Sequence, residues 1–261
     1  MIKFFRKIRY DLLNKSKTGK YLKYAVGEII LVVVGILIAL QINNWNELQK
    51  DKTLRKTYIE RLLGDLQADT LIYSFDIEDT KVKVKDSKYV RKIVDGTIPL
   101  KDTSSFVIRL QAIGRLLRPV LNDNTFDELK SSSNLKLFED LELVDAIRNY
   151  YNQIPTWWFN SYYNQLVEGY LPIVVDAIPL FIHEEILYPK IDSLTPSNSL
   201  NRASLKIDPL SMQIILNGIR NNKEFDFHLK RISRSHIVQQ KMLEDCKENA
   251  TRLMETIGKL N

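Results

Sequence analysis

The longest apolar run of the chain lies near its N-terminus, where residues 25–42 read AVGEIILVVVGILIALQI. As a helix, the 22 residues from Tyr24 to Trp45 would extend about 33 Å, enough to cross a hydrocarbon core of about 30 Å. Val and Ile dominate, without the repeating polar face of a surface helix. Tyr24 and Trp45 also stand where interfacial aromatic residues belong. The pattern predicts a transmembrane helix over residues 25–46.

The second strong pattern is the helical spacing of apolar residues after the span. Leu62, Leu66, Tyr73 and Ile77 belong to one stripe of a long first helix. Gly is scarce, and strand-like alternation between turn pairs is rare. We therefore interpret residues 47–261 as one all-α domain, a helical bundle with long first and last helices.

Local stop signals divide this domain. The first helix should end near Asp95-Gly96, because Gly and a following Pro99 are typical of a helix C-terminus. Further helices are predicted over 106–117, around Phe126 and over 141–152, with a break at Ser131–Asn134. Three prolines should divide the aromatic region 150–188 into short pieces: Pro172, Pro179 and Pro189.

The last helix has the most regular pattern of the chain. Its seam residues alternate three and four apart, as in a heptad repeat with polar interruptions. They are Leu229, Ile232, His236, Gln239, Leu243, Cys246, Ala250, Leu253, Ile257 and Leu260. This seam is predicted to pack on the long first helix or to pair with another subunit.

Charge changes the interpretation of the span. Residues 1–24 hold eight Lys and Arg against Asp11, a net charge of +7, whereas the whole chain carries +6. Because positive flanks stay in the cytoplasm, we expect the N-terminus inside and residues 47–261 outside, in the periplasm. We interpret the span as an uncleaved signal anchor, since no A-x-A site follows it. A cleaved signal peptide is the alternative.

The basic tail, residues 1–24, has apolar residues at helical spacing, among them Ile2, Phe5 and Ile8. It is interpreted as an amphipathic helix lying on the anionic inner leaflet. An ordinary positive flank of the span is the alternative. No basic patch interleaved with aromatic residues occurs elsewhere, so nucleic acid is not an expected partner.

A few polar and small residues interrupt the span. Glu28 lies about one turn inside it, and ionisable residues in membrane segments are functional candidates. Snorkelling to the interface or pairing with Lys23 is the structural alternative. Gly35 and Ala39 form a small-xxx-small pattern that lets helices approach closely. This pattern suggests a homo-oligomer, although small residues are common in membrane helices.

The aromatic region contains the candidate ligand pocket. Trp157, Trp158, Tyr162 and Tyr163 could line it, with His183 nearby, but a cluster of this kind also forms cores between helices. His183-Glu184-Glu185 lacks the second His, four residues on, that a zinc-binding HExxH helix requires. No metal and no cofactor is therefore expected.

Catalytic motifs are also missing from the sequence. Cys246 is the only cysteine, and on one helix it would lie about 15 Å from His236, too far for a nucleophile and its base. No G-x-S-x-G elbow and no phosphate-binding glycine loop occurs. The sequence thus predicts a protein that is not an enzyme.

Two segments resemble a known family. YAVGEIILVVVGILIALQINNWNE resembles the N-terminal signature of an uncharacterised family of Bacteroidota membrane proteins, domain of unknown function 6090. NTFDELKSSSNLKLF is similar to a second motif of that family, with Ser133 where Gly is usual. The resemblance implies a Gram-negative inner-membrane protein with a periplasmic helical body, and it supplies no activity and no functional residue.

Three functional hypotheses follow. The first is a non-enzymatic single-pass membrane protein whose helical domain binds a protein or envelope component. The second is an extracytoplasmic sensor that acts through a partner, because the sequence contains no second span to carry a signal. The third is an enzyme, or an ion-coupled subunit that uses Glu28.

Overall fold

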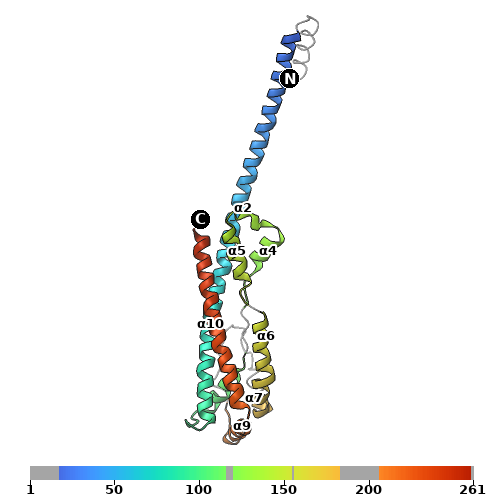
Figure 1. Cartoon of the computed structure of the whole chain (residues 1–261). Helices are drawn as coiled ribbons and strands as arrows, with labels where there is room; N and C mark the ends of the chain where they lie inside the picture. The colour runs from blue at the N-terminus through green and yellow to red at the C-terminus, as the bar shows by residue number, and fades with distance from the viewer. Residues whose placement is uncertain (1–17, 116–119, 155, 183–205, 260–261) are drawn as a thin grey trace. The chain divides into compact units, whose positions relative to one another are not determined.

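The computed structural model describes residues 18–115, 120–154, 156–182 and 206–259, and these form helices joined by short connections (Figure 1). No strand occurs in these ranges, which confirms the all-α prediction. The chain divides into two compact units, residues 1–58 and 59–261. We describe each by itself and call the second unit the body.

Helix α2 (Thr18–Val94) contains the predicted span. Its most apolar stretch has a mean hydropathy of 2.6, and none of that stretch is buried. Within the described ranges this is the one helix long and apolar enough to cross a membrane, judged by length and composition. The amphipathic helix predicted in the tail stays a prediction, because residues 1–17 lie outside the described residues.

In the body, α2 ends where the sequence predicted. Its last residue is Val94, and Gly96 has a φ of +80°, a left-handed conformation that Gly adopts without strain. Arg220 then donates to the carbonyl oxygens of Ile93 and Val94, both at 3.0 Å. Arg220 thereby satisfies the Val94 carbonyl at the helix end and adds a second donor at Ile93, which also accepts from Gly96 N–H at 3.2 Å.

The remaining helices of the body follow in chain order. They are α3 (Thr103–Ile113), α4 (Asn124–Ser131), η1 (Asn134–Leu137), α5 (Leu141–Tyr151), α6 (Thr156–Gln165), η2 (Leu166–Tyr170), α7 (Leu171–Ala177), α9 (Pro209–Asn221) and α10 (Phe225–Gly258). Asp102, Asp140 and Asp208 cap α3, α5 and α9 by accepting from first-turn N–H groups. The predicted break at Ser131–Asn134 is present, with Ser133 left-handed at a φ of 57°.

Two local predictions were wrong. The helix predicted over 106–117 begins earlier and ends at Ile113, because Asp102 caps it and Gly114 closes it. Pro172 does not break the aromatic region, since α6, η2 and α7 run on without interruption. Pro172 has no N–H for the carbonyl of Glu168, and the chain instead forms a π turn in which Leu171 N–H bonds to Leu166 O.

The core of the body lies where α3 is enclosed by longer helices. Phe106, Leu110 and Ile113 of α3 are fully buried, and α2, α7, α9 and α10 contribute to the same apolar cluster. Helix α10 runs beside α2 in the opposite direction, with Arg91 paired to Asp226 at 2.8 Å near the start of α10 (Figure 1). Every predicted seam residue of α10 within the described range is buried.

Candidate functional site

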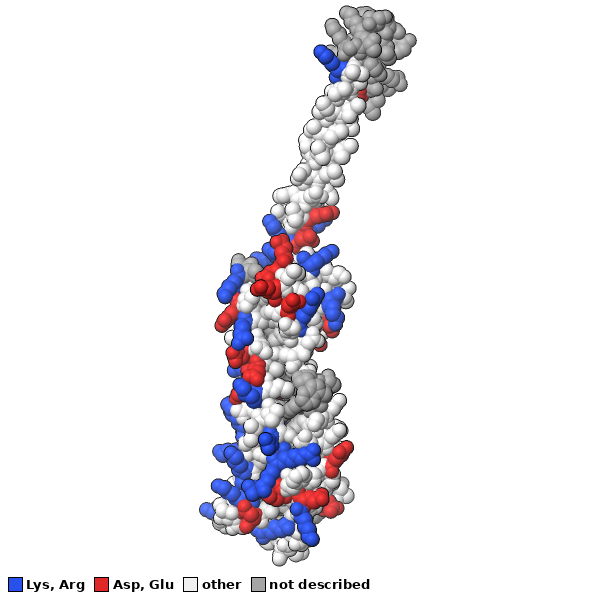
Figure 2. All heavy atoms as spheres, viewed as in Figure 1, with Lys and Arg blue, Asp and Glu red and all other residues white. Residues whose placement is uncertain are grey.

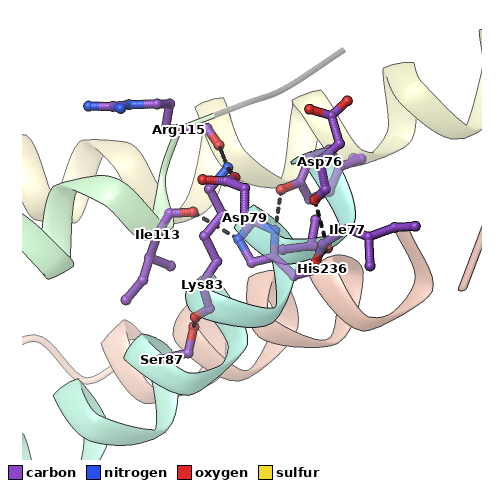
Figure 3. Close-up of polar contacts among 10 residues, drawn as sticks. Asp76, Ile77, Asp79, Lys83, Ser87, Ile113, Arg115 and His236 are labelled. Atoms are coloured by element: carbon purple, nitrogen blue, oxygen red, sulfur yellow. Dashed lines mark hydrogen bonds and ion pairs between the residues drawn. The ribbon is translucent and has the colours of Figure 1, made fainter. Parts of the chain in front are cut away.

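The seam between α2 and α10 is polar along its middle. Asp76, Thr80 and Lys83 of α2 are buried, with exposed fractions of 5%, 0% and 2%. His236 of α10 is buried beside them (Figure 3), and Gln239 is buried one turn further along α10. We call these five residues the seam cluster. Buried polar groups cost free energy unless they are hydrogen-bonded, so the partners of this cluster decide what it does.

His236 connects three helices. Its Nε2 lies 2.9 Å from the carbonyl oxygen of Ile113 (Figure 3). Its Nδ1 lies 2.8 Å from the hydroxyl of Tyr162. A carbonyl can only accept, so Nε2 carries the proton and Nδ1 accepts from Tyr162. Neutral His236 therefore joins α10 to the end of α3 and to α6.

Lys83 binds a carbonyl two residues further on, just beyond the end of α3. Its Nζ donates to Arg115 O at 2.6 Å and forms an ion pair with Asp79 at 2.7 Å (Figure 3). Lys83 and His236 thus bind the C-terminal end of α3 from two different helices. A positive group is favourable there, because carbonyl dipoles place negative charge at a helix C-terminus.

Burial determines the electrostatics of the seam cluster. It lowers the pKa of His236 to about 4 and lowers the pKa of Lys83, since both charged forms lose hydration. The bond to Ile113 O opposes the shift of His236, and repulsion from Lys83 adds to it. Burial likewise raises the pKa of Asp76. His236 is therefore neutral at pH 7.

A second polar group lies between α2 and α5. Asp69 is 1% exposed and accepts from the backbone N–H and the side chain of Asn122, at 2.9 and 2.6 Å. Tyr150 donates to its other oxygen at 2.6 Å, and the Tyr73 hydroxyl lies 3.5 Å from that of Tyr150. Burial raises the pKa of Tyr150 and of Tyr73, so both stay protonated and can donate.

The candidate residues of the span all lie on α2. Gly35, Ala39 and Trp45 are exposed, and a Cβ added at Gly35 would meet nothing within 4 Å. Glu28 is partly buried. The structure leaves the small-residue face open, and its role in oligomerisation stays a prediction.

The candidate pocket residues do not share one environment. Tyr162 is 1% exposed in the core, whereas Tyr163 is 47% exposed on the surface. Tyr162 and Tyr163 therefore do not line one cavity. His183 lies outside the described residues, as do the side chains of Trp157 and Trp158, so the pocket as a whole stays a prediction.

The chemistry open to the seam cluster is limited. Among the described residues, no group of three or more His, Cys, Asp or Glu side chains is arranged to hold a metal ion. Burial raises the pKa of the Cys246 thiol to about 11, which keeps it protonated and poorly nucleophilic. What the described polar groups do best is fix helices against one another.

Sequence reasoning found two of the five residues of the seam cluster. The heptad pattern placed His236 and Gln239 on the seam, but the apolar stripe assigned to α2 passed over Asp76, Thr80 and Lys83. The signal was present in the spacing, since these residues continue the buried face of α2 from Leu66. A search limited to apolar residues could not detect them.

The described residues define a class of protein by their fold: an all-helical body in a chain whose helix α2 is long and apolar enough to span a membrane. Residues 28–113 match the model of a family of unknown function, DUF6090. Over that range the predicted family is confirmed. No curated protein and no solved structure matches the chain.

Proposed function

We propose that this protein is a single-pass inner-membrane protein with its N-terminus in the cytoplasm and its helical body in the periplasm. The body binds a protein or another envelope component and performs no catalysis. The observation that carries the proposal is the apolar surface of α2, which no described part of the chain covers.

The energetics of the span support membrane insertion. Eleven Val, Leu and Ile residues lie between Ile29 and Ile42. Each favours insertion by about 0.3–0.6 kcal/mol, a sum of about 3–7 kcal/mol. A carboxylate at the bilayer centre costs about 3 kcal/mol, and Glu28 lies nearer the edge. The apolar residues therefore outweigh the one acidic residue.

An interaction role is supported by the way the body uses its polar residues. His236, Lys83 and Asp69 bind other groups of the body rather than facing an open cavity. The arrangement favours a rigid helical scaffold. A sensor that acts through a partner is the second candidate, and the seam cluster favours it, because displacement of α10 would release the end of α3.

Thiol labelling of the full chain in cells tests the topology. Leu141 is 76% exposed, so the thiol of Leu141→Cys should react with a membrane-impermeant maleimide once the outer membrane is permeabilised. Lys7→Cys should react only after the inner membrane is opened. The unmodified chain is the control, since Cys246 is buried. Labelling of Lys7→Cys before Leu141→Cys would overturn the orientation.

Membrane extraction tests the anchor. The chain should stay with the membrane in alkaline carbonate, whereas Val33→Arg with Leu37→Arg should release it. Leu71→Arg is the matched control, because Leu71 is an exposed apolar residue of the body part of α2. Release of the unmodified chain by carbonate would contradict membrane spanning.

A further inference from the structure

Positive charge is concentrated at one end of the body. This basic end comprises residues 81–115, 166–182 and 206–234, which share the apolar cluster around α3. It holds fifteen Lys and Arg against eight Asp and Glu, a net charge of +7. The rest of residues 25–261 sums to −8. In Figure 2, Lys and Arg gather along the lower part of the body.

The basic residues of this end include a regular stripe. Lys81, Lys85, Lys88 and Lys92 recur four, three and four apart, so they lie on one face of α2, and all are exposed. Like charges one turn apart repel each other by a few tenths of a kcal/mol per pair. An ion pair with Glu78 at 2.7 Å offsets this repulsion at Lys81, as carboxylates do for Lys130 and Arg252 elsewhere on the body, so the repulsion falls on Lys85, Lys88 and Lys92. An anionic partner would relieve the repulsion along the stripe.

Large apolar side chains project from the same end. They lie in the first two turns of α9, in the first turn of α10 or just after α7. Their exposed fractions range from 53% to 73%: Leu180, Phe181, Leu210, Ile214 and Phe227. Projecting apolar residues among Lys and Arg are typical of surfaces that dip into a bilayer interface.

We propose that the basic end of the body binds the surface of an anionic phospholipid bilayer. Lys and Arg would contact the phosphate headgroups, and the projecting apolar residues would enter the interface. A flat lipid surface can accept side chains spread over several helix ends, whereas an acidic peptide needs a continuous groove. The inference rests on the proposed interaction role and names its partner.

Site-specific fluorescence tests this proposal with the full chain held in nanodiscs of phosphatidylcholine. An environment-sensitive dye is placed at Leu210→Cys or, as the control, at Leu141→Cys, which is 76% exposed outside the basic end. On adding vesicles containing phosphatidylglycerol, the dye at position 210 should shift to the blue and the dye at 141 should not. Both proteins carry the basic tail, so its attraction to the vesicles cancels in the comparison.

Charge variants test the electrostatic part. Neutralising Lys92, Lys223 and Arg231 to Gln should weaken vesicle binding on the order of 100-fold, since each cation contributes about fivefold at lipid surfaces. The same change at Lys241, Lys247 and Arg252 alters net charge equally and should leave binding nearly unchanged. Phosphatidylcholine vesicles should not bind.

Equal responses at positions 210 and 141, or equal losses in both charge variants, would overturn the proposal. If the true partner were an acidic protein, the dye at position 210 would not respond to vesicles. A blue shift at position 210 therefore supports the lipid surface, and no shift there favours the protein partner. If the proposed membrane anchor is wrong, the chain will not insert into nanodiscs, and this result is independent of vesicle binding. In that case the vesicle assay is performed on the chain in solution.

Discussion

Tyr162 and His236 lie 74 residues apart in the chain and share a hydrogen bond of 2.8 Å inside the core. The opposite nitrogen of the imidazole donates to Ile113 O, which sets the tautomer, so Nδ1 accepts from Tyr162. One side chain therefore holds α6, α10 and the end of α3 together. The consequences can be measured as pH dependence and as stability.

Acid should destabilise the body through His236. The pKa of His236 is about 4 in the folded chain and 6.5 when the side chain is exposed. Between pH 4 and pH 6.5 the unfolded chain therefore binds a proton that the folded chain does not bind. Stability is full above pH 6.5 and should fall by about 3 kcal/mol as the pH drops to 4. Urea unfolding of the full chain in detergent, followed by circular dichroism across this range, measures the slope.

His236→Gln is the matched variant, because Gln can still donate to Ile113 O but does not titrate. Its unfolding free energy should lose that part of the pH dependence. A slope unchanged from the natural chain would assign the acid sensitivity to groups whose folded pKa is lowered, such as Asp208, whose carboxylate accepts from Ser211.

Lys83→Met should loosen the end of α3. The substitution keeps the buried chain length but removes the donor to Arg115 O, and an unmade bond in the core costs about 1–3 kcal/mol. Hydrogen exchange should increase at Gly114 and Arg115. Lys85→Met, at an exposed position of the same helix, should change stability by less than about 0.5 kcal/mol. Equal effects of the two variants would contradict a structural role for Lys83.

Two glycine variants should shift stability in opposite directions. A Cβ at Gly169, in the π turn, would overlap Nδ1 of His228, so Gly169→Ala should destabilise the body by about 1–3 kcal/mol. At Gly64 of α2 a Cβ meets nothing within 4 Å, and Gly64→Ala should stabilise by about 0.5–1 kcal/mol. Thermal unfolding compares them directly, and a stable Gly169→Ala would mean that His228 has room to move.

Tyr150→Phe should destabilise the body by about 1–3 kcal/mol. The change leaves the buried Asp69 carboxylate without one of its donors while keeping the ring in place. Tyr163→Phe, at a half-exposed position, is the control and should be nearly neutral. Chemical unfolding separates the two, and a neutral Tyr150→Phe would show that water replaces the hydroxyl.

Self-association through the span can be tested at Gly35. The position is exposed and open, so Gly35→Cys in native membranes should form a disulfide with a second copy if the Gly35/Ala39 face pairs. Leu37→Cys, on another face of the helix, should crosslink less. A strict monomer with both variants would contradict pairing by this face.

The elements predicted well are those set by local sequence. The stop of α2 at Val94 follows from Gly96, and the break at Ser133 from a cluster of small polar residues. The π turn at Leu166–Tyr170 was missed, because Pro172 is compatible with either a helix break or a bulge. Only the packing of α7 on α9 favours one continuous helix.

By itself, the sequence determined the apolar run at Ala25–Ile42, its basic flank and the heptad seam of α10, since each depends on residues close together in the chain. Tertiary structure decided which polar residues are buried. Asp69 and Lys83 are residue types that usually face solvent, and their environment, like that of Tyr162, is set by Asn122, Arg115 and His236, far away in sequence. A buried charge is tolerated only where hydrogen-bond or ion-pair partners lie beside it, and only the folded chain brings such distant partners together.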